Sequence, residues 1–351
     1  MRAVVVHAAG DVRVQELPDP VAGPGEVLLA VEHAGLCGSD LSYARHGATG
    51  TAVLKHPLVL GHEVAGRVAA LGPGVRAGER GVEVGQAVTV HPATPVGDTA
   101  LPERLAGRTN LHRQVRYWGS AMLDPHTDGG MCELKAVRVD QLRPLPEGVS
   151  TRVGALAEPF AVALHAVGRL GEVTGRRVLV NGSGPVGALV VAALKHRGAA
   201  HVVAADVAPA SLAVARAVGA DETVDLSAGQ RLPQDEELVV EASGAPAALG
   251  GVLAATARGG HVVQVGNLPG TPAPAALGDL VTREITWSGS FRFVDEIDEA
   301  VAAMAAGVDV SPVITHEFDV ADAVEAVRVA SDRSTGSSKV LVRFASDRIA
   351  P

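Results

Sequence analysis

Residues 177–187 read RVLVNGSGPVG, and this stretch decides the fold of the middle of the chain. RVLVN predicts a short buried strand. Gly182, Gly184 and Gly187 follow with the spacing G-x-G-x-x-G, and apolar residues at helical spacing continue to about residue 197. Glycines between a strand and a helix permit a tight turn and let the backbone approach the pyrophosphate of a dinucleotide closely. We therefore predict a dinucleotide-binding turn at this point.

A carboxylate defines the second part of this site. The strand predicted at 201–206 ends in Asp206, about 20 residues past Gly187, where an acidic side chain can bind ribose hydroxyls. Asp206 would also repel a 2′-phosphate, and no arginine follows it before Arg216. The sequence therefore favours NAD, while use of NADP stays open. The residues expected to contact the cofactor are Gly182, Gly184, Pro185, Val186, Gly187, Asp206, Ser243, Val265, Gly266 and Ser290.

Strands and helices alternate on both sides of the glycine-rich turn. A helix is predicted from Val153 to Leu170, and the later elements are strands at 222–226, 238–244 and 261–266 and helices at 209–218 and 247–257. The segment between 225 and 238 is too short and polar for a full crossover helix. The alternation predicts an α/β fold with a doubly wound parallel sheet over residues 146–288.

The flanking segments have a different character. Residues 1–145 contain short β-branched runs separated by Gly, Pro and Asp, which is typical of a compact, barrel-like sheet. Residues 92–114 have no clear period and predict a surface lobe. Beyond residue 288 the predicted elements are helices at 295–307 and 318–330, the second capped by Asp319, and a closing strand at 338–344. We expect 1–145 and 289–351 to form one domain, interrupted by 146–288.

Composition excludes several classes of function. Apolar residues make up 47% of the 351 residues, enough for full cores, and the net charge of −9 with no basic run argues against a nucleic-acid partner. No secretory start or long apolar window is present, so we expect neither a membrane span nor export. The only cysteines are Cys37, in a turn, and Cys132, in a strand run that indicates a core position. A disulfide framework is excluded, and a cytoplasmic protein is expected.

Two short motifs predict a metal site. CGSD (37–40) provides a thiol at Cys37, and VLGHEVAG (59–66) places His62 beside Glu63. Thiolate, imidazole and carboxylate together are a ligand set for zinc. Both motifs lie in glycine-rich turns, where side chains are accessible for binding. We therefore predict that Cys37 and His62 hold a zinc ion together with an acidic residue.

The motifs resemble, in their order along nearly the whole chain, those of the zinc-dependent medium-chain dehydrogenase/reductase family. The matching segments are CGSD, GHEVAG, AEP (157–159), GSGPVG (182–187), ASG (242–244) and VGN (265–267). The resemblance implies a GroES-like catalytic domain, 1–145 and 289–351, with an inserted Rossmann dinucleotide-binding domain, 146–288. It also implies a homodimer or homotetramer, with the segments 261–266 and 285–290 at the contact.

The polyol branch of this family fits best. AEPFAVALHA (157–166) resembles the helix in which that branch carries a glutamate, so Glu158 becomes a candidate third zinc ligand and Glu63 its rival. YWGSAMLDPHTDGGM (117–131) and SGSFRF (288–293) resemble members that oxidise a sugar acid. The resemblance implies reversible, NAD-dependent oxidation of L-idonate at C5 to 5-keto-D-gluconate. The alternatives are another polyol, such as sorbitol or xylitol, and a zinc-free reductase or non-catalytic cofactor-binding protein.

The chain departs from the family pattern at two places. The family usually carries four cysteines in the lobe that corresponds to 92–114, where they hold a structural zinc, and this chain has none there. We therefore expect one catalytic zinc and no structural zinc. The family often has a histidine where this chain has Ser42, so a proton relay through that position is in doubt.

The remaining candidate residues concern the reaction and the substrate. Ser39 lies two residues past Cys37 and could carry the alcohol proton away. A sugar acid needs a cation for its carboxylate, and the resemblance places Arg292 there. Arg116 is a weaker candidate. Tyr43 and Trp118 could line the substrate pocket or simply pack in the core.

Overall fold

The structure is a computed structural model that describes residues 1–78 and 82–344, and its contacts divide the chain into two compact units. Unit 1 comprises Met1–Glu158 and the described residues from Ile314 onward, and unit 2 comprises Pro159–Val313. Helix α3 (Ala157–Leu170) runs without a break across the first division.

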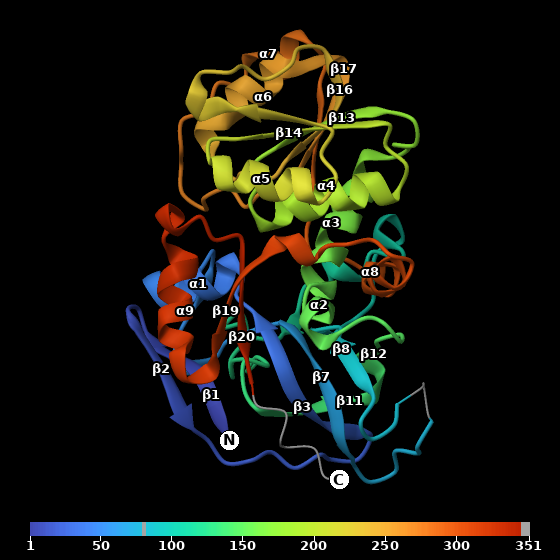
Figure 1. Ribbon diagram of the computed structural model, residues 1–351, viewed down its shortest axis with the longest axis vertical. Helices are drawn as coiled ribbons and strands as arrows, with labels where there is room; N and C mark the ends of the chain where they lie inside the picture. Colours follow the sequence, from blue (N-terminus) through green and yellow to red (C-terminus); the bar gives the residue numbers. More distant parts are fainter. Residues whose placement is uncertain (79–81, 345–351) are drawn as a thin grey trace. The chain divides into compact units, whose positions relative to one another are not determined.

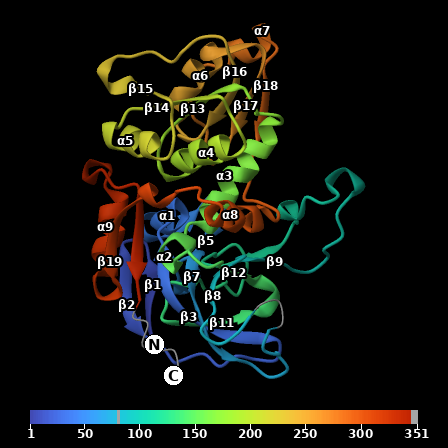
Figure 2. The same ribbon diagram turned by 45° about the vertical axis from the view of Figure 1, so that its right-hand side comes forward.

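Unit 2 contains a six-stranded parallel sheet covered by helices on both faces. Its strands are β13 (Arg177–Asn181), β14 (His201–Asp206), β15 (Glu222–Asp225), β16 (Glu236–Glu241), β17 (Thr256–Gln264) and β18 (Thr286–Gly289). Its other helices are α4 (Pro185–His196), α5 (Pro209–Ala217), α6 (Leu249–Ala255), α7 (Gly278–Thr282) and α8 (Glu296–Ala305). Figures 1 and 2 show α4 and α5 on one face of the sheet and α6 and α7 on the other. The predicted doubly wound parallel sheet is therefore confirmed.

The strand order is β15-β14-β13-β16-β17-β18, so the direction of winding reverses between β13 and β16. In such sheets a ligand binds outside the carboxyl ends of the strands, at this reversal. Pro185 and Pro209 occupy first turns of α4 and α5, where the missing N–H costs nothing. Between β15 and β16 the chain forms only a 3₁₀ turn, Leu226–Ala228, as its short polar sequence predicts.

Unit 1 is mainly β-structure around one large apolar core. Its strands are β1 (Arg2–Ala8), β2 (Asp11–Glu16), β3 (Glu26–Gly35), β4 (Ala48–Thr49), β5 (Ala52–Val53), β6 (Leu58–Val59), β7 (Glu63–Leu71), β8 (Ala87–Val90), β9 (Ala93–Pro95), β10 (Val115–Tyr117), β11 (Leu134–Arg138), β12 (Leu142–Pro144), β19 (Ile314–Asp319) and β20 (Lys339–Arg343). Its helices are α1 (Gly38–His46), α2 (Thr151–Gly154) and α9 (Ala323–Ser331). The largest sheet has the order β12-β8-β7-β3-β20-β19, and β11 pairs with β3. Figure 2 shows the segment between β9 and β10 extending from these sheets as a lobe.

The chain beyond residue 288 differs from its sequence-based description in two respects. Helix α8 belongs to unit 2, because Glu296 bonds His165 of α3 at 2.6 Å and Glu299 bonds Arg197 at 2.7 Å. The contacts therefore divide the chain after Glu158 and Val313, whereas the boundaries expected from sequence were 145 and 288.

Asp319 does not cap the helix predicted at 318–330. It ends strand β19 and pairs with Arg343 of β20 at 2.7 Å, and α9 begins only at Ala323. Strand β19 alternates between more buried and exposed residues. It was not predicted because it is short and lies between two segments with a helical pattern. None of the helices in residues 1–78 and 82–344 has both the length and the apolar character needed to cross a membrane.

Candidate metal centre and dinucleotide site

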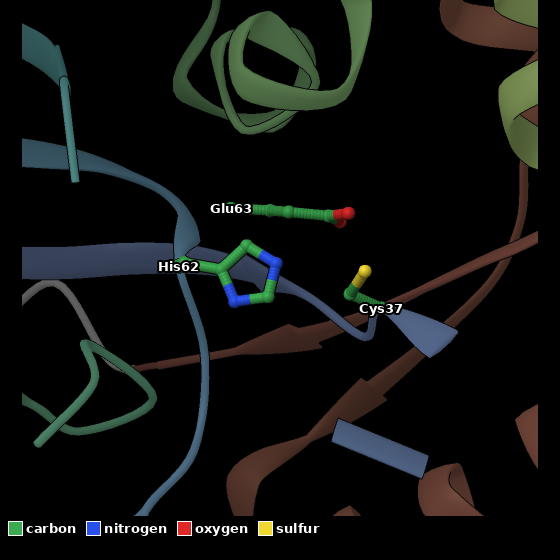
Figure 3. A group of neighbouring side chains, drawn as sticks. All are labelled: Cys37, His62 and Glu63. Atoms are coloured by element: carbon green, nitrogen blue, oxygen red, sulfur yellow. The ribbon is translucent and has the colours of Figure 1, made fainter. Parts of the chain in front are cut away.

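Three potential metal ligands gather in unit 1 because β3 and β7 pair antiparallel. Gly35, at the end of β3, lies opposite Glu63, at the start of β7, and this register brings Cys37 next to His62. One ligand atom from each of Cys37, His62 and Glu63 lies within 4.8 Å of the other two. Figure 3 shows the thiol, the far ring nitrogen of His62 and the carboxylate turned toward a common space. No other such group occurs among the residues that the structure describes.

The donor set fits a zinc ion. Thiolate, imidazole and carboxylate are all zinc ligands, and His62 and Glu63 are buried while Cys37 keeps partial exposure. Burial alone would lower the pKa of His62, but the negative charges of Cys37 and Asp40 raise it well above its usual value. The site thus holds an excess of negative charge, which a bound dication would offset.

Glu63 already has a cation partner. Both of its carboxylate oxygens lie 2.7 Å from Nζ of Lys339, which also donates to the carbonyl of Leu36 at 3.0 Å. The side chains of this ion pair are only 1% and 3% exposed. Burial lowers the pKa of Lys339, but the negative charges of Glu63, Cys37 and Glu158 together raise it above its usual value, so the amine stays charged. Lys339 therefore competes with any metal for the Glu63 oxygens.

Glu158 is a second buried glutamate near His62. It lies in the first turn of α3, is 4% exposed and accepts a hydrogen bond from the Tyr117 hydroxyl at 2.5 Å. Burial raises its pKa, and the opposing effects of His62 and Tyr117 are smaller. Within the described residues Glu158 forms no ion pair. Its oxygens lie outside the 4.8 Å group, but its charge acts on His62.

Asp40 fixes the position of the Cys37 thiol. Its carboxylate is fully buried and accepts hydrogen bonds from the N–H groups of Cys37 at 2.9 Å and Gly61 at 3.1 Å. It thereby caps α1 and ties the segment before His62 to that helix. Ser39 lies in the same first turn and is partly buried, two residues from Cys37.

The glycine-rich turn of unit 2 has the backbone geometry expected of a dinucleotide site. Gly182 has φ of +92°, and a Cβ atom on Gly187 would approach the Gly182 carbonyl closer than 3.0 Å, so both positions require glycine. The Asp206 carboxylate accepts from the N–H groups of Ser183 at 2.6 Å and Ala208 at 2.8 Å. Asp206 is therefore held against the turn, at the carboxyl end of β14.

Two protein-family models match the chain: the alcohol dehydrogenase GroES-like domain over residues 23–147 and the zinc-binding dehydrogenase domain over residues 185–306. L-idonate 5-dehydrogenase (NAD(P)(+)) of Escherichia coli strain K12 is 36% identical over 90% of this chain and 91% of that protein. The chain belongs to the zinc-dependent medium-chain dehydrogenase family.

Similar proteins include further dehydrogenases of polyols. Sorbitol dehydrogenase of Gallus gallus is 34% identical over 92% of this chain and 91% of its own length. The crystal structure of the E. coli L-idonate 5-dehydrogenase has a TM-score of 0.88 and covers 98% of both chains at 36% identity. The 2R,3R-butanediol dehydrogenase of Bacillus subtilis has a TM-score of 0.84 at 28% identity, covering 97% of this chain and 99% of its own. The expected GroES-like and Rossmann-type architecture is thus confirmed.

The other residues expected at the dinucleotide site of this dehydrogenase lie on turns at the carboxyl ends of strands in unit 2. Pro185 and Val186 begin α4, and Ser243 follows β16. The N–H groups of Val265 and Gly266, after β17, both donate to the Glu241 carbonyl at 2.9 Å. The fourth turn follows β18, where the N–H of Ser290 donates to the Gln264 carbonyl at 2.9 Å.

The residues considered for substrate binding occupy varied environments. Tyr43 is 1% exposed and its hydroxyl accepts from the N–H of Ala121 at 2.9 Å, while Trp118 is 5% exposed and belongs to the unit 1 core. Arg116 donates to the Pro125 carbonyl at 3.1 Å. Arg292 is partly buried in unit 2, with φ of +52° and its guanidinium 4.8 Å from the Phe291 ring centre. Tyr43 and Trp118 thus pack in the core of unit 1, and a place for either in the substrate pocket stays a prediction.

Sequence reasoning missed Asp40, Lys339 and Tyr117. Asp40 carried a signal, because an acidic residue three positions past the residue before a helix is a capping pattern. Lys339 is the first residue of an otherwise apolar strand, and a lysine there indicates a buried acidic partner. That partner, Glu63, is 276 residues away in the sequence and could not be identified from it. Tyr117 carried no signal of its own beyond its position in the segment 117–131, which the sequence analysis had linked to the substrate.

Proposed function

We propose that this dehydrogenase catalyses the reversible, NAD-dependent oxidation of a secondary alcohol in a polyol or sugar acid, with L-idonate, oxidised at C5 to 5-keto-D-gluconate, as its substrate. The observation that carries this proposal is the group of Cys37, His62 and Glu63, whose chemistry suits a catalytic zinc. The 36% identity to a protein named L-idonate 5-dehydrogenase supports the choice of substrate.

Cys37, His62 and Glu158 would hold the zinc ion. Glu158 is favoured over Glu63 because Glu63 already shares its charge with Lys339, whereas a dication would be the first cationic partner of Glu158 within the described residues. When bound, zinc supplies a Lewis acid that makes the hydroxyl of the alcohol more acidic. Neither the lobe at 92–114 nor another described segment offers a second group of ligands, and we propose one zinc per chain.

The remaining roles fall to residues of both units. The Ser39 hydroxyl, two residues from Cys37, would accept the alcohol proton and pass it to solvent. NAD, when bound, supplies the hydride acceptor. The Asp206 carboxylate would bind the adenosine ribose hydroxyls, which favours NAD over NADP. Arg292 would bind the substrate carboxylate, because a guanidinium forms paired hydrogen bonds with that group.

Two alternatives remain within the same family. Sorbitol or xylitol would replace the sugar acid if Arg292 contacts hydroxyl groups instead of a carboxylate.

In solution we expect a homodimer or homotetramer, because β18 is an edge strand of the unit 2 sheet and can pair with a second copy.

The test is a panel of carbonyl substrates with purified, zinc-analysed protein. NADH oxidation would be followed with 5-keto-D-gluconate, fructose and xylulose, each also with NADPH. We expect 5-keto-D-gluconate with NADH to give a kcat/KM at least about tenfold higher than any other pair. A preference for fructose would move the substrate to sorbitol, and protein holding less than about half a zinc per chain would contradict the catalytic metal.

A further inference from the structure

Glu241 is a buried carboxylate that the proposed reaction does not use. It ends strand β16, is 0% exposed and forms no ion pair among the described residues. Its oxygens instead accept from the side-chain amides of Asn181 and Gln264, from the N–H of Gly244, and from both the N–H and hydroxyl of Ser243. A buried charge is costly unless donors surround it, so this arrangement is a built feature of the sheet edge.

The donors come from three neighbouring strands at one level. Asn181 of β13 pairs with Glu241 of β16, and Glu241 pairs with Gln264 of β17. Residues paired across parallel strands point to the same face, so the three side chains form a row. The row crosses the reversal between β13 and β16, at the carboxyl ends where dinucleotides bind in such sheets.

Each member of the row directly precedes, or bonds to, a turn expected to touch the cofactor. The three turns are also packed against one another. A Cβ atom on Gly182 would lie closer than 3.0 Å to the N of Ser243, and one on Gly266 would lie equally close to the N of Gly244. A shift of the Ser243–Gly244 turn would therefore displace both the glycine-rich turn and the turn after β17.

We propose that Glu241 is a positioning residue for the dinucleotide: its carboxylate holds the turns after β13, β16 and β17 in the conformation that receives the cofactor. The inference rests on the proposed use of NAD. Glu241 itself is covered by protein and acts through Ser243, Gly244 and Gln264. A surface ordered before binding loses less conformational entropy on binding, so its affinity is higher.

The same strand provides a matched control. Glu236, at the other end of β16, is 4% exposed and bonds Nε of Arg177 at 2.8 Å. It is nearly as buried as Glu241, but it lies at the amino end of the sheet, away from the turns. If Glu241 served stability alone, replacing either residue would have the same effect on cofactor binding.

The experiment uses the full chain with its zinc. Glu241→Gln keeps the shape of the side chain, but its amide nitrogen cannot accept the hydrogen bonds that now reach one oxygen. NADH affinity would be measured by fluorescence titration, and unfolding by urea. We expect Glu241→Gln to raise the NADH Kd about tenfold or more, and Glu236→Gln to change it less than about twofold, even where both variants unfold at lower urea.

Ser243→Ala gives a second, milder measurement if Glu241→Gln does not fold. It removes the hydroxyl donor and leaves both backbone donors, and we expect about a threefold rise in Kd. An unchanged Kd in the folded variants, or an equal rise in Glu236→Gln, would overturn the positioning role. Wild-type protein that binds no NADH would instead contradict the proposed function, so the two failures are distinguishable.

Discussion

At the residue scale, the two buried glutamates near His62, Glu63 and Glu158, differ in the groups that contact their carboxylates. Glu63 forms an ion pair with Lys339, whereas Glu158 accepts a hydrogen bond from the uncharged hydroxyl of Tyr117. We predict that Glu158→Gln lowers bound zinc below about half an equivalent, because it removes a ligand charge. Glu63→Gln should keep the zinc but lose about 3–5 kcal/mol of folding free energy, because it leaves the Lys339 amine buried without its carboxylate. Metal analysis and urea unfolding measure the two effects.

A third buried glutamate in unit 1 controls for general damage to the fold. Glu133 is 4% exposed and pairs with Arg2 at 2.8 Å, outside the metal group. Glu133→Gln should therefore lose stability and keep its zinc. The reverse pattern, in which Glu63→Gln loses zinc and Glu158→Gln retains it, would assign the ligand to Glu63.

The two cysteines should differ in their reactivity. Burial raises the pKa of the Cys132 thiol to about 11, so at pH 8 only about one molecule in a thousand carries the reactive thiolate. We predict that iodoacetamide leaves Cys132 unlabelled in the native protein, with labelling rising only as the pH approaches that value. Cys37 is partly exposed and should react only after chelation of the metal. Peptide mass spectrometry with and without chelator measures both, and labelling of Cys37 in zinc-loaded protein would contradict its role as a ligand.

At the scale of elements, the metal group depends on how α1 begins. The Asp40 carboxylate serves two donors, the N–H groups of Cys37 and Gly61, and an asparagine offers only one oxygen. We predict that Asp40→Asn costs about 1–3 kcal/mol of stability, because one buried donor loses its partner. Zinc affinity, measured by competition with a chelator, should fall about 10–100-fold as Cys37 shifts from His62.

Asp319 is the control for this prediction. It also precedes a helical segment, but its side chain is 59% exposed and pairs with Arg343. Asp319→Asn should change stability by less than about 0.5 kcal/mol and leave zinc affinity unchanged. An Asp40→Asn protein with wild-type zinc affinity would show that the Cys37 position does not depend on the cap.

The elements that could be predicted from sequence are those whose pattern is local. The strand at 177–181 and the glycine-rich turn were readable because alternation, glycine spacing and a helix start lie within a few residues of one another. Strand β19 was not, since only its pairing with β20 identifies it. The same distinction applies to the site: Cys37 and His62 stand in recognisable motifs, but the contact of Glu63 with Lys339 arises only when β20 joins β3 in the sheet.

At the scale of the whole molecule, the residues proposed to bind the metal and those proposed to bind the dinucleotide belong to different units. Cys37, His62, Glu63 and Glu158 lie in unit 1, and the cofactor turns and Glu241 lie in unit 2. A metal that binds only the folded state stabilises it, by about 4 kcal/mol at a thousandfold excess over Kd. We therefore predict that zinc removal lowers the stability of unit 1 and abolishes turnover, while the dinucleotide site keeps its structure.

Calorimetry and NADH titration on chelated protein test this separation. We expect a melting transition that moves to lower temperature and returns when zinc is added back, with an NADH Kd within about twofold of the loaded protein. The complementary variant is Glu241→Gln, which should keep a full complement of zinc while its NADH affinity falls. Loss of NADH binding on chelation would contradict the prediction, because it would mean that a metal in unit 1 is needed to form a cofactor site whose proposed residues all lie in unit 2.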